Sequence, residues 1–201
     1  METLITLIRH GETDWNVERR WQGFENTSLN ENGRQQARDT AQYLYAAGFT
    51  RIISSDLARA LETAIIIGEI LNLSVATDER LREINVGKWQ GLTHDEISVQ
   101  YPEEYALAAI EPYIEMRFPG GESRAELRQR AGAALNDFVQ HYPGEHILVS
   151  THGGTIRTIL HNLMQPLPDE KFHNCCLTRL RYTGTTWQAI GINLEAKNIC
   201  W

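Results

Sequence analysis

The sequence predicts an α/β fold in which a mostly parallel sheet is covered by helices on both faces. Short apolar segments rich in β-branched residues, typical of buried strands, alternate along most of the chain with segments whose apolar residues repeat at the helical period. The 201 residues are 42% hydrophobic and 22% charged, an ordinary globular composition. This length and composition predict one domain over 1–201 with a sizeable core.

The first part of the chain contains three predicted strands and two helices. The strands are expected at 3–8, 51–54 and 73–77, with a loop at about 11–29. Asn30 is placed to cap a helix that runs to about Ala47. Ser55 or Asp56 is expected to cap a second helix, which continues through Leu71.

The second part continues the alternation and ends in a hairpin. We expect two short helices within 93–110, a turn at 119–121, a long helix from 122 or 123 to about 141, a strand at 147–150, a helix at 153–164, and hairpin strands at 176–182 and 187–193. The stretch at about 93–121 is predicted to form a lid-like excursion over the edge or top of the sheet.

Charge and hydropathy argue against nucleic acid and membranes as partners. The net charge of −7 argues against nucleic acid. No apolar run approaches the roughly 20 residues of a membrane span, and the first residues lack a basic leader, so we expect no membrane partner and no signal peptide. The three cysteines, with Cys175 and Cys176 adjacent, suit a reducing, cytoplasmic location. We expect this pair to be half-buried strand residues and not metal ligands.

Polar clusters follow three predicted strands at their carboxyl ends. They contain Arg9 and His10 after the first strand, Arg59 after the second, and His152 after the strand at 147–150. Because ligands of open α/β sheets bind beyond these ends, we expect the four side chains to converge. Helix N-termini behind Arg59 and His152 would favour an anion there.

These residue types suit phosphate chemistry. A guanidinium is always charged and matches phosphate oxygens with paired donors. Neighbouring arginines would lower the pKa of the His10 imidazole and keep it nucleophilic. Gly11 is expected to let the backbone come close to a ligand. A lone histidine or arginine is more often structural, and a metal site on His10 and His152 lacks a carboxylate at useful spacing. The two His-Gly pairs at strand ends nevertheless favour a phosphate site with its own nucleophile.

Longer motifs support the same interpretation. They are RHGET at 9–13 with WN at 15–16, QG at 22–23, LNENGRQQA at 29–37, SSDLARALETA at 54–64, LREINVGKWQG at 81–91, PGGES at 119–123 and STHGG at 150–154. In this order they resemble the signatures of the histidine phosphatase superfamily, the phosphoglycerate mutase-like proteins. The resemblance implies a three-layer α/β/α sandwich around a mixed, mostly parallel sheet.

The resemblance also implies residue roles. His10 would be the nucleophile that becomes phosphohistidine, while Arg9, Arg59 and His152 hold the transferring phosphoryl group. Glu83 would protonate the leaving oxygen and later take a proton from water. Further matches near the phosphate pocket are Asn16, Gln22, Gly23 and Gly153. Neither a metal nor a cofactor is implied.

Three functions stay open at this stage: a phosphomonoesterase, a mutase and a phospho-ligand-binding protein. The nucleophile, acid and arginines argue against a mere binder, and PGGES in place of a long basic, proline-rich insertion resembles the small phosphatase branch. We expect hydrolysis of a small phosphorylated metabolite, and a homodimer stays open. The residues His94, Tyr101, Tyr105, Tyr113, Met116 and Arg117 would face the leaving group or pack the helices. Arg82 and Lys88 would read a second acidic group or lie on the surface.

Overall fold

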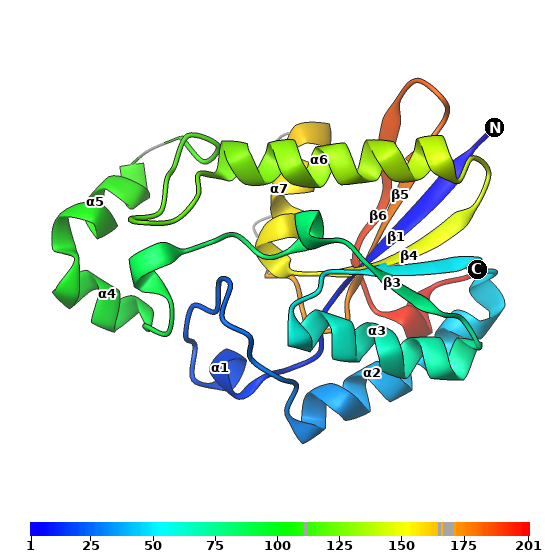
Figure 1. The fold of residues 1–201 in the computed structure, drawn as a ribbon, viewed down its shortest axis with the longest axis horizontal. Helices are drawn as coiled ribbons and strands as arrows, with labels where there is room; N and C mark the ends of the chain where they lie inside the picture. The colour runs from blue at the N-terminus through cyan, green and yellow to red at the C-terminus, as the bar shows by residue number, and fades with distance from the viewer. Residues whose placement is uncertain (111, 165, 167–170) are drawn as a thin grey trace.

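A six-stranded sheet, in the order β3-β2-β4-β1-β5-β6, forms the centre of the computed structural model (Figure 1). The structure describes residues 1–110, 112–164, 166 and 171–201. The strands are β1 (Thr3–Arg9), β2 (Arg51–Ser54), β3 (Val75–Thr77), β4 (His146–Thr151), β5 (Leu177–Tyr182) and β6 (Trp187–Leu194). β1 to β4 run parallel, and β5 is antiparallel to both β1 and β6. The predicted mixed, mostly parallel sheet is confirmed.

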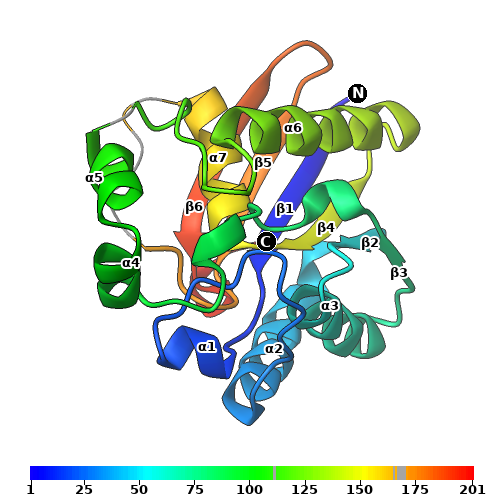
Figure 2. The ribbon, with the colours of Figure 1, turned by 60° about the vertical axis from the view of Figure 1, so that its left-hand side comes forward.

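Helices cover both faces of the sheet, as predicted. They are α1 (Asp14–Val17), α2 (Glu31–Leu44), α3 (Ala58–Leu71), α4 (His94–Gln100), α5 (Pro102–Ile110), α6 (Arg124–His141) and α7 (Gly153–Leu163). Single 3-10 turns occur at Tyr45–Ala47, Glu79–Leu81, Gly87–Trp89 and Ala196–Asn198. Figures 1 and 2 show α2 and α3 on one face, with α6 and α7 on the other. No helix in the described ranges is both long and apolar enough to cross a membrane.

Alternation along β1 supplies both layers of core. Ile5 and Leu7 are inaccessible and belong to the cluster that includes α6 and α7, whereas Ile8 belongs to the cluster with α2 and α3. Each such buried side chain stabilises the fold by about 1.5–3 kcal/mol relative to an exposed one. The strand is therefore fixed from both sides, which gives Arg9 and the following His10 a rigid support.

The ends of three strands coincide. In the register of the sheet, Ile8 pairs with Ser150, and Ser54 of β2 pairs with the same Ser150. β1, β4 and β2 are parallel neighbours, so their carboxyl ends meet at one edge. This is the edge at which the sequence places the polar clusters.

Most predicted helix boundaries are confirmed by their caps. The Asn30 side chain accepts a hydrogen bond from the Gly33 amide at 2.8 Å, and Gly48 adopts a left-handed φ of 69° after the last turn. Ser123 caps α6 in a reciprocal capping box with Glu126. These local signals can be read directly from sequence because they act over three or four residues.

The predicted cap of α3 is wrong. The helix is preceded by Leu57, which makes no side-chain capping bond. The Ser55 hydroxyl instead lies 2.9 Å from the His152 ring nitrogen, and Asp56 forms an ion pair with Arg82. Both expected caps are therefore engaged by partners far away in the sequence. Tertiary contacts override the local preference here.

The predicted lid region holds α4, α5 and the turn before α6, at one end of the molecule (Figure 1). Tyr101 and Tyr105 pack against the apolar core, and Met116 is buried. The exposed Arg117 pairs with Glu126. The packing interpretation of the two tyrosines is thus confirmed, whereas closure of this region over a ligand stays a prediction.

Cys175 and Cys176 are not half-buried strand residues. Both are buried and lie in the turn that leads into β5. Burial raises the pKa of each thiol to about 12. The Cys175 amide donates to the Arg9 carbonyl at 3.0 Å, and the Arg9 amide donates to the Cys176 carbonyl at 3.2 Å. This turn therefore holds the end of β1 in place.

Candidate active site

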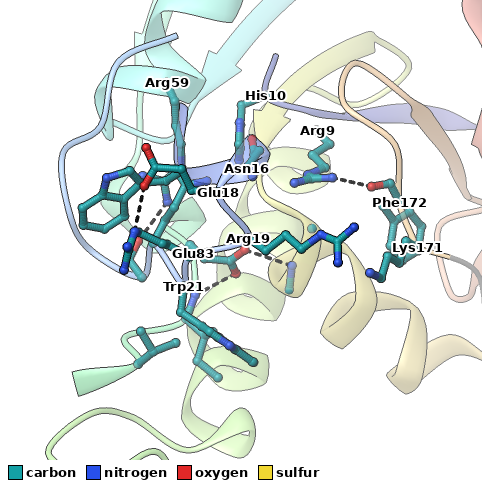
Figure 3. Close-up of a pocket in the computed structure, with 18 of the residues that line it drawn as sticks. Arg9, His10, Asn16, Glu18, Arg19, Trp21, Arg59, Glu83, Lys171 and Phe172 are labelled. Atoms are coloured by element: carbon teal, nitrogen blue, oxygen red, sulfur yellow. Dashed lines mark hydrogen bonds and ion pairs between the residues drawn. The ribbon is translucent and has the colours of Figure 1, made fainter. Parts of the chain in front are cut away.

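A cavity of about 770 Å³ opens at the carboxyl ends of β1, β2 and β4 (Figure 3). The sequence-predicted residues that line it are Arg9, His10, Asn16, Gln22, Gly23, Arg59, Glu83 and Gly153. His152 lies against His10, with 5.3 Å between the ring centroids. The structure thus brings together all nine residues that the motifs single out.

The His10 imidazole is held as a neutral ring with one free nitrogen. Its Nδ1 lies 2.7 Å from the Gly11 carbonyl. Because a carbonyl only accepts, Nδ1 carries the proton and Nε2 keeps its lone pair. Burial, and then the charges of Arg59 and Arg9, place the pKa of His10 well below its usual 6.5. The ring can therefore act as a nucleophile at neutral pH.

Arg59 is anchored by backbone oxygens. Its Nη2 donates to the Gly23 carbonyl at 2.9 Å, and its Nη1 donates to the Glu25 carbonyl at 2.8 Å. The side chain is fully buried, and this desolvation lowers its pKa to about 10. The guanidinium therefore stays charged at neutral pH. Because it is shielded from solvent in the wall of the cavity, where the dielectric constant is low, it interacts strongly with an anionic ligand.

Arg9 is anchored in the same way from another segment. Its Nη1 donates to the Phe172 carbonyl, just before β5 (Figure 3). Its Nε, like that of Arg59, is buried without a hydrogen-bond partner in the described part of the chain. Two oriented cations with unmatched donors beside a neutral imidazole favour an oxygen-rich anion.

His152 presents a donor of its own. Its Nε2 lies 2.9 Å from the Ser55 hydroxyl, which also accepts the Leu57 amide at 3.3 Å. The hydroxyl can then donate its own proton to Nε2, which leaves the ring proton on Nδ1. Nδ1 is buried, without a partner among the described residues. Burial, followed by Arg59 and His10, puts the pKa of His152 well below 6.5, so the ring is neutral.

Glu83 is positioned by backbone amides. Its Oε1 accepts from the Ile84 amide at 2.8 Å, and its Oε2 accepts from the Gly154 amide at 3.0 Å. Arg130 donates to the Glu83 main-chain carbonyl at 2.7 Å. The carboxylate lines the same cavity as His10, where it can exchange a proton with a group bound between them.

The model of the histidine phosphatase superfamily, branch 1, matches residues 5–195. The chain belongs to this superfamily. The predicted family and its phosphoglycerate mutase-like fold are confirmed.

Relatives within this superfamily carry different names. The chain is 36% identical over 196 residues to a probable phosphoglycerate mutase GpmB of Yersinia pestis, covering 96% of this chain and 91% of the relative. It is 32% identical to a mycobacterial glucosyl-3-phosphoglycerate phosphatase solved with VO3, with a TM-score of 0.82 and coverage of 94% and 98%. YhfR of Bacillus stearothermophilus is 34% identical, with a TM-score of 0.85 and coverage of 94% and 95%. A phosphoglycerate mutase structure from Bacillus anthracis, at 22% identity, shares the fold.

Gly11 differs from the expectation. Gly11 does not line the cavity, and an added Cβ would meet the Gly33 carbonyl oxygen at 2.5 Å. The glycine is required for packing against α2, not for approach of a ligand. Arg82 and Lys88 lie outside the cavity lining, which fits the surface alternative stated for them.

The sequence interpretation missed several residues that support the site. Asn174 donates to the His10 carbonyl at 2.9 Å and to the Asn16 side-chain oxygen at 3.2 Å. Arg130 and Gly154 hold Glu83. The second glycine of the STHGG motif was a usable signal for Gly154. Asn174 and Arg130 stand in no motif that could have revealed them.

Replacing Gly154 by alanine is expected to displace Glu83. An added Cβ would lie 2.5 Å from the Glu83 Oε1, although alanine at this helical position favours α7 by up to about 1 kcal/mol. We expect kcat on an alkyl phosphate to fall about tenfold, part of the roughly 10²–10⁴ that general acid catalysis supplies. Gly132→Ala in α6 is the matched control, since its Cβ would meet nothing within 4 Å. Equal kcat in the two variants would contradict this role.

Acidification is expected to destabilise the fold through the two buried histidines. The pKa values of His10 and His152 lie well below 6.5 in the folded state and return to about that value on unfolding. Below pH 6.5 the unfolded chain therefore binds more protons, so the free energy of unfolding falls as the pH drops. Urea unfolding at pH 7.5 and 5.5 measures this, and His152→Gln should shrink the difference. A free energy that is unchanged or larger at pH 5.5 would refute it.

Proposed function

We propose that this protein is a metal-independent phosphomonoesterase that hydrolyses small phosphorylated metabolites through a phosphohistidine on His10. The observation that carries the proposal is the neutral His10 ring, with its unprotonated Nε2, beside two buried guanidinium groups in one cavity. Phosphoryl transfer needs positioning and charge stabilisation above all, and Arg9 and Arg59 supply both.

In the first step, Nε2 of His10 attacks the phosphorus as the bond to the leaving oxygen breaks. Glu83, protonated on one oxygen at this stage, gives its proton to the departing alkoxide. The guanidinium groups of Arg9 and Arg59 neutralise charge on the phosphoryl oxygens, and the Nδ1 proton of His152 donates to one of them. The products are an alcohol and phosphohistidine.

In the second step, water attacks the phosphohistidine. The Glu83 carboxylate takes a proton from this water as the new P–O bond forms, and the P–N bond to His10 breaks. Inorganic phosphate leaves, and Glu83 is protonated again for the next cycle. The same carboxyl group thus serves as acid and then as base, and the amides of Ile84 and Gly154 orient it in the cavity.

A phosphatase is favoured over a mutase by the short connection at 112–123. The Pro119-Gly120-Gly121 turn returns directly to Ser123, the cap of α6, and contains no long basic, proline-rich insertion. The mycobacterial glucosyl-3-phosphoglycerate phosphatase, which matches over almost its whole length, fits this interpretation. The probable phosphoglycerate mutase at 36% identity makes a mutase the second candidate.

Phosphate release from 3-phosphoglycerate, with and without a bisphosphorylated primer, separates the two functions. A phosphatase releases phosphate without primer. Isomerisation that requires primer and releases little phosphate would establish the mutase instead. A panel of phosphomonoesters, assayed with and without a chelator and with His10→Ala as the blank, tests which esters are hydrolysed and whether a metal is needed. Activity lost on adding chelator would contradict the metal-independent mechanism.

A further inference from the structure

We propose that Arg130 and Glu122 form one positioning unit, which fixes the loop that carries Glu83 and thereby sets the rate of proton transfer to the leaving group. Neither side chain is among the described residues that line the cavity, so both act on the substrate through Glu83. This inference rests on the proposed phosphatase function and deepens it. It also assigns a role to the PGGES motif at 119–123, which contains Glu122.

The loop that carries Glu83 has no regular structure of its own. It connects the 3-10 turns Glu79–Leu81 and Gly87–Trp89, and residues 82–86 belong to no helix or strand. Such a segment keeps one conformation only if other parts of the molecule satisfy its main-chain polar groups. The position of the Glu83 carboxylate therefore depends on what binds this loop.

Arg130 binds the loop from the second turn of α6. Its Nη1 donates to the carbonyls of Arg80 and Arg82 at 2.9 and 2.7 Å, and its Nη2 donates to the Glu83 carbonyl at 2.7 Å. The Nε and the same Nη2 also donate to the two Glu122 carboxylate oxygens, at 3.0 and 2.9 Å. All five N–H groups of the guanidinium are thus used, and three of them hold the main chain that leads to Glu83.

Glu122 holds the next part of the same loop. Its Oε2 accepts from the Asn85 amide at 2.9 Å, and its own amide donates to the Asn85 carbonyl at 3.0 Å. Gly121 allows this close approach, since an added Cβ would lie 2.1 Å from the Asn85 carbonyl oxygen. The motif therefore places a carboxylate where it binds the loop and neutralises Arg130 at the same time.

The ion pair is largely shielded from solvent. The exposed fractions of the two side chains are 21% for Arg130 and 14% for Glu122, compared with 35% and 46% for the neighbouring pair of Arg80 and Asp137. Each shielded charge is compensated mainly by its partner, so removing one leaves the other uncompensated. We therefore expect Arg130 and Glu122 to act together, with effects that do not add.

The contacts of Glu83 connect this pair to the chemistry. Its carboxylate accepts from the Ile84 amide of the same loop and from the Gly154 amide of α7. A displaced loop would carry the carboxylate away from Gly154, whereas His10 and Arg59 are held by bonds to other segments. Loss of the pair should therefore slow proton transfer and leave binding of the phosphate largely intact.

Arg130→Gln is expected to slow esters with poor leaving groups selectively. We expect kcat for an alkyl phosphate to fall about tenfold, part of the roughly 10²–10⁴ that general acid catalysis supplies, with KM little changed. Phosphoenzyme formation from nitrophenyl phosphate, whose leaving group needs no proton, should fall much less. Arg130→Lys should recover part of the loss, since it keeps the charge but not the five donors. Equal slowing of the two esters in Arg130→Gln would overturn the positioning role.

Glu122→Gln tests the same pair with a smaller change of shape. It should show the same selective loss, and the double variant with Arg130→Gln should be no slower than Arg130→Gln alone. Fully additive losses would refute the assignment to one unit. Arg80→Gln is the matched control, because the Arg80 side chain joins the same 3-10 turn to α6 through Asp137 at 2.6 Å without a bond to Glu83. It should keep the wild-type ratio of the two rates.

The wild-type enzyme separates failure of this inference from failure of the proposed function. Release of phosphate from neither ester, with no phosphohistidine formed, would refute the phosphatase function itself. Normal turnover by the wild type, together with a wild-type ratio of the two rates in both Arg130→Gln and Glu122→Gln, would refute only the role of the ion pair.

Discussion

Replacing His10 by alanine is expected to lower kcat by about 10⁵-fold or more and to abolish the phosphoenzyme. The reason is geometric: within the described cavity, His10 is the imidazole whose unprotonated nitrogen is set by its Nδ1 bond to Gly11. The wild-type enzyme, quenched during turnover of a ³²P-labelled ester, should carry acid-labile, base-stable label. The variant should carry none.

The control for this experiment is His146, a partly buried histidine at the other end of the sheet. His146 begins β4 and bonds to Thr6 and to the Ala47 carbonyl, remote from the carboxyl ends of the strands. His146→Gln should cost stability and still form the phosphoenzyme. Circular dichroism of both variants establishes that they fold. If His10→Ala retained label, the nucleophile would have to be another residue.

Replacing Glu83 by glutamine is expected to have the second largest effect, and its size should depend on the leaving group. An alkoxide leaves poorly without a proton, so kcat for an alkyl phosphate should fall by roughly 10²–10⁴. A nitrophenolate needs no proton to leave, so phosphoenzyme formation from nitrophenyl phosphate should fall much less. Rapid-quench measurement of the burst separates this first step from hydrolysis of the intermediate.

Glu12 supplies the control carboxylate. It stands two residues from the nucleophile, yet its Oε1 accepts from the amides of Asn30 and Asn32 at 3.0 Å, beside the start of α2. Glu12 does not line the cavity. We expect Glu12→Gln to keep the leaving-group dependence of the wild type. If the rate of Glu83→Gln depended on the leaving group in the same way as that of the wild type, Glu83 would not be the general acid.

The order of strands and helices could be predicted because each element has a local signal. Asn30 caps α2, Gly48 ends the 3-10 turn that follows this helix, and the residues of β1 that contact the two helical layers alternate. The cap of α3 could not be predicted, because the Ser55 hydroxyl forms a hydrogen bond with His152, which follows β4 and is far away in the sequence. An N-cap contributes only about 1 kcal/mol, so a tertiary hydrogen bond of similar strength can replace it.

The same distinction applies to the site. His10, Arg9, Arg59 and His152 follow strands, so sheet geometry alone predicts that they meet. Glu83 lies in a loop between short 3-10 turns, and only its motif indicated it. The groups that orient these side chains are largely main-chain amides and carbonyls, such as those of Gly154 and Phe172. Because every residue has a main-chain amide or carbonyl, the sequence carries no trace of which ones are used.

The position of β1 has a consequence for the order of events on the ribosome. β1 is the first strand synthesised, yet its neighbours are β4 and β5, which begin at His146 and Leu177. If the ribosome adds about 10 residues per second, more than 10 s pass between the synthesis of β1 and that of β4, its first partner strand. A nascent chain released before residue 146 would have the nucleophile but no assembled pocket around it. Phosphatase activity should therefore appear only after nearly the whole chain has emerged.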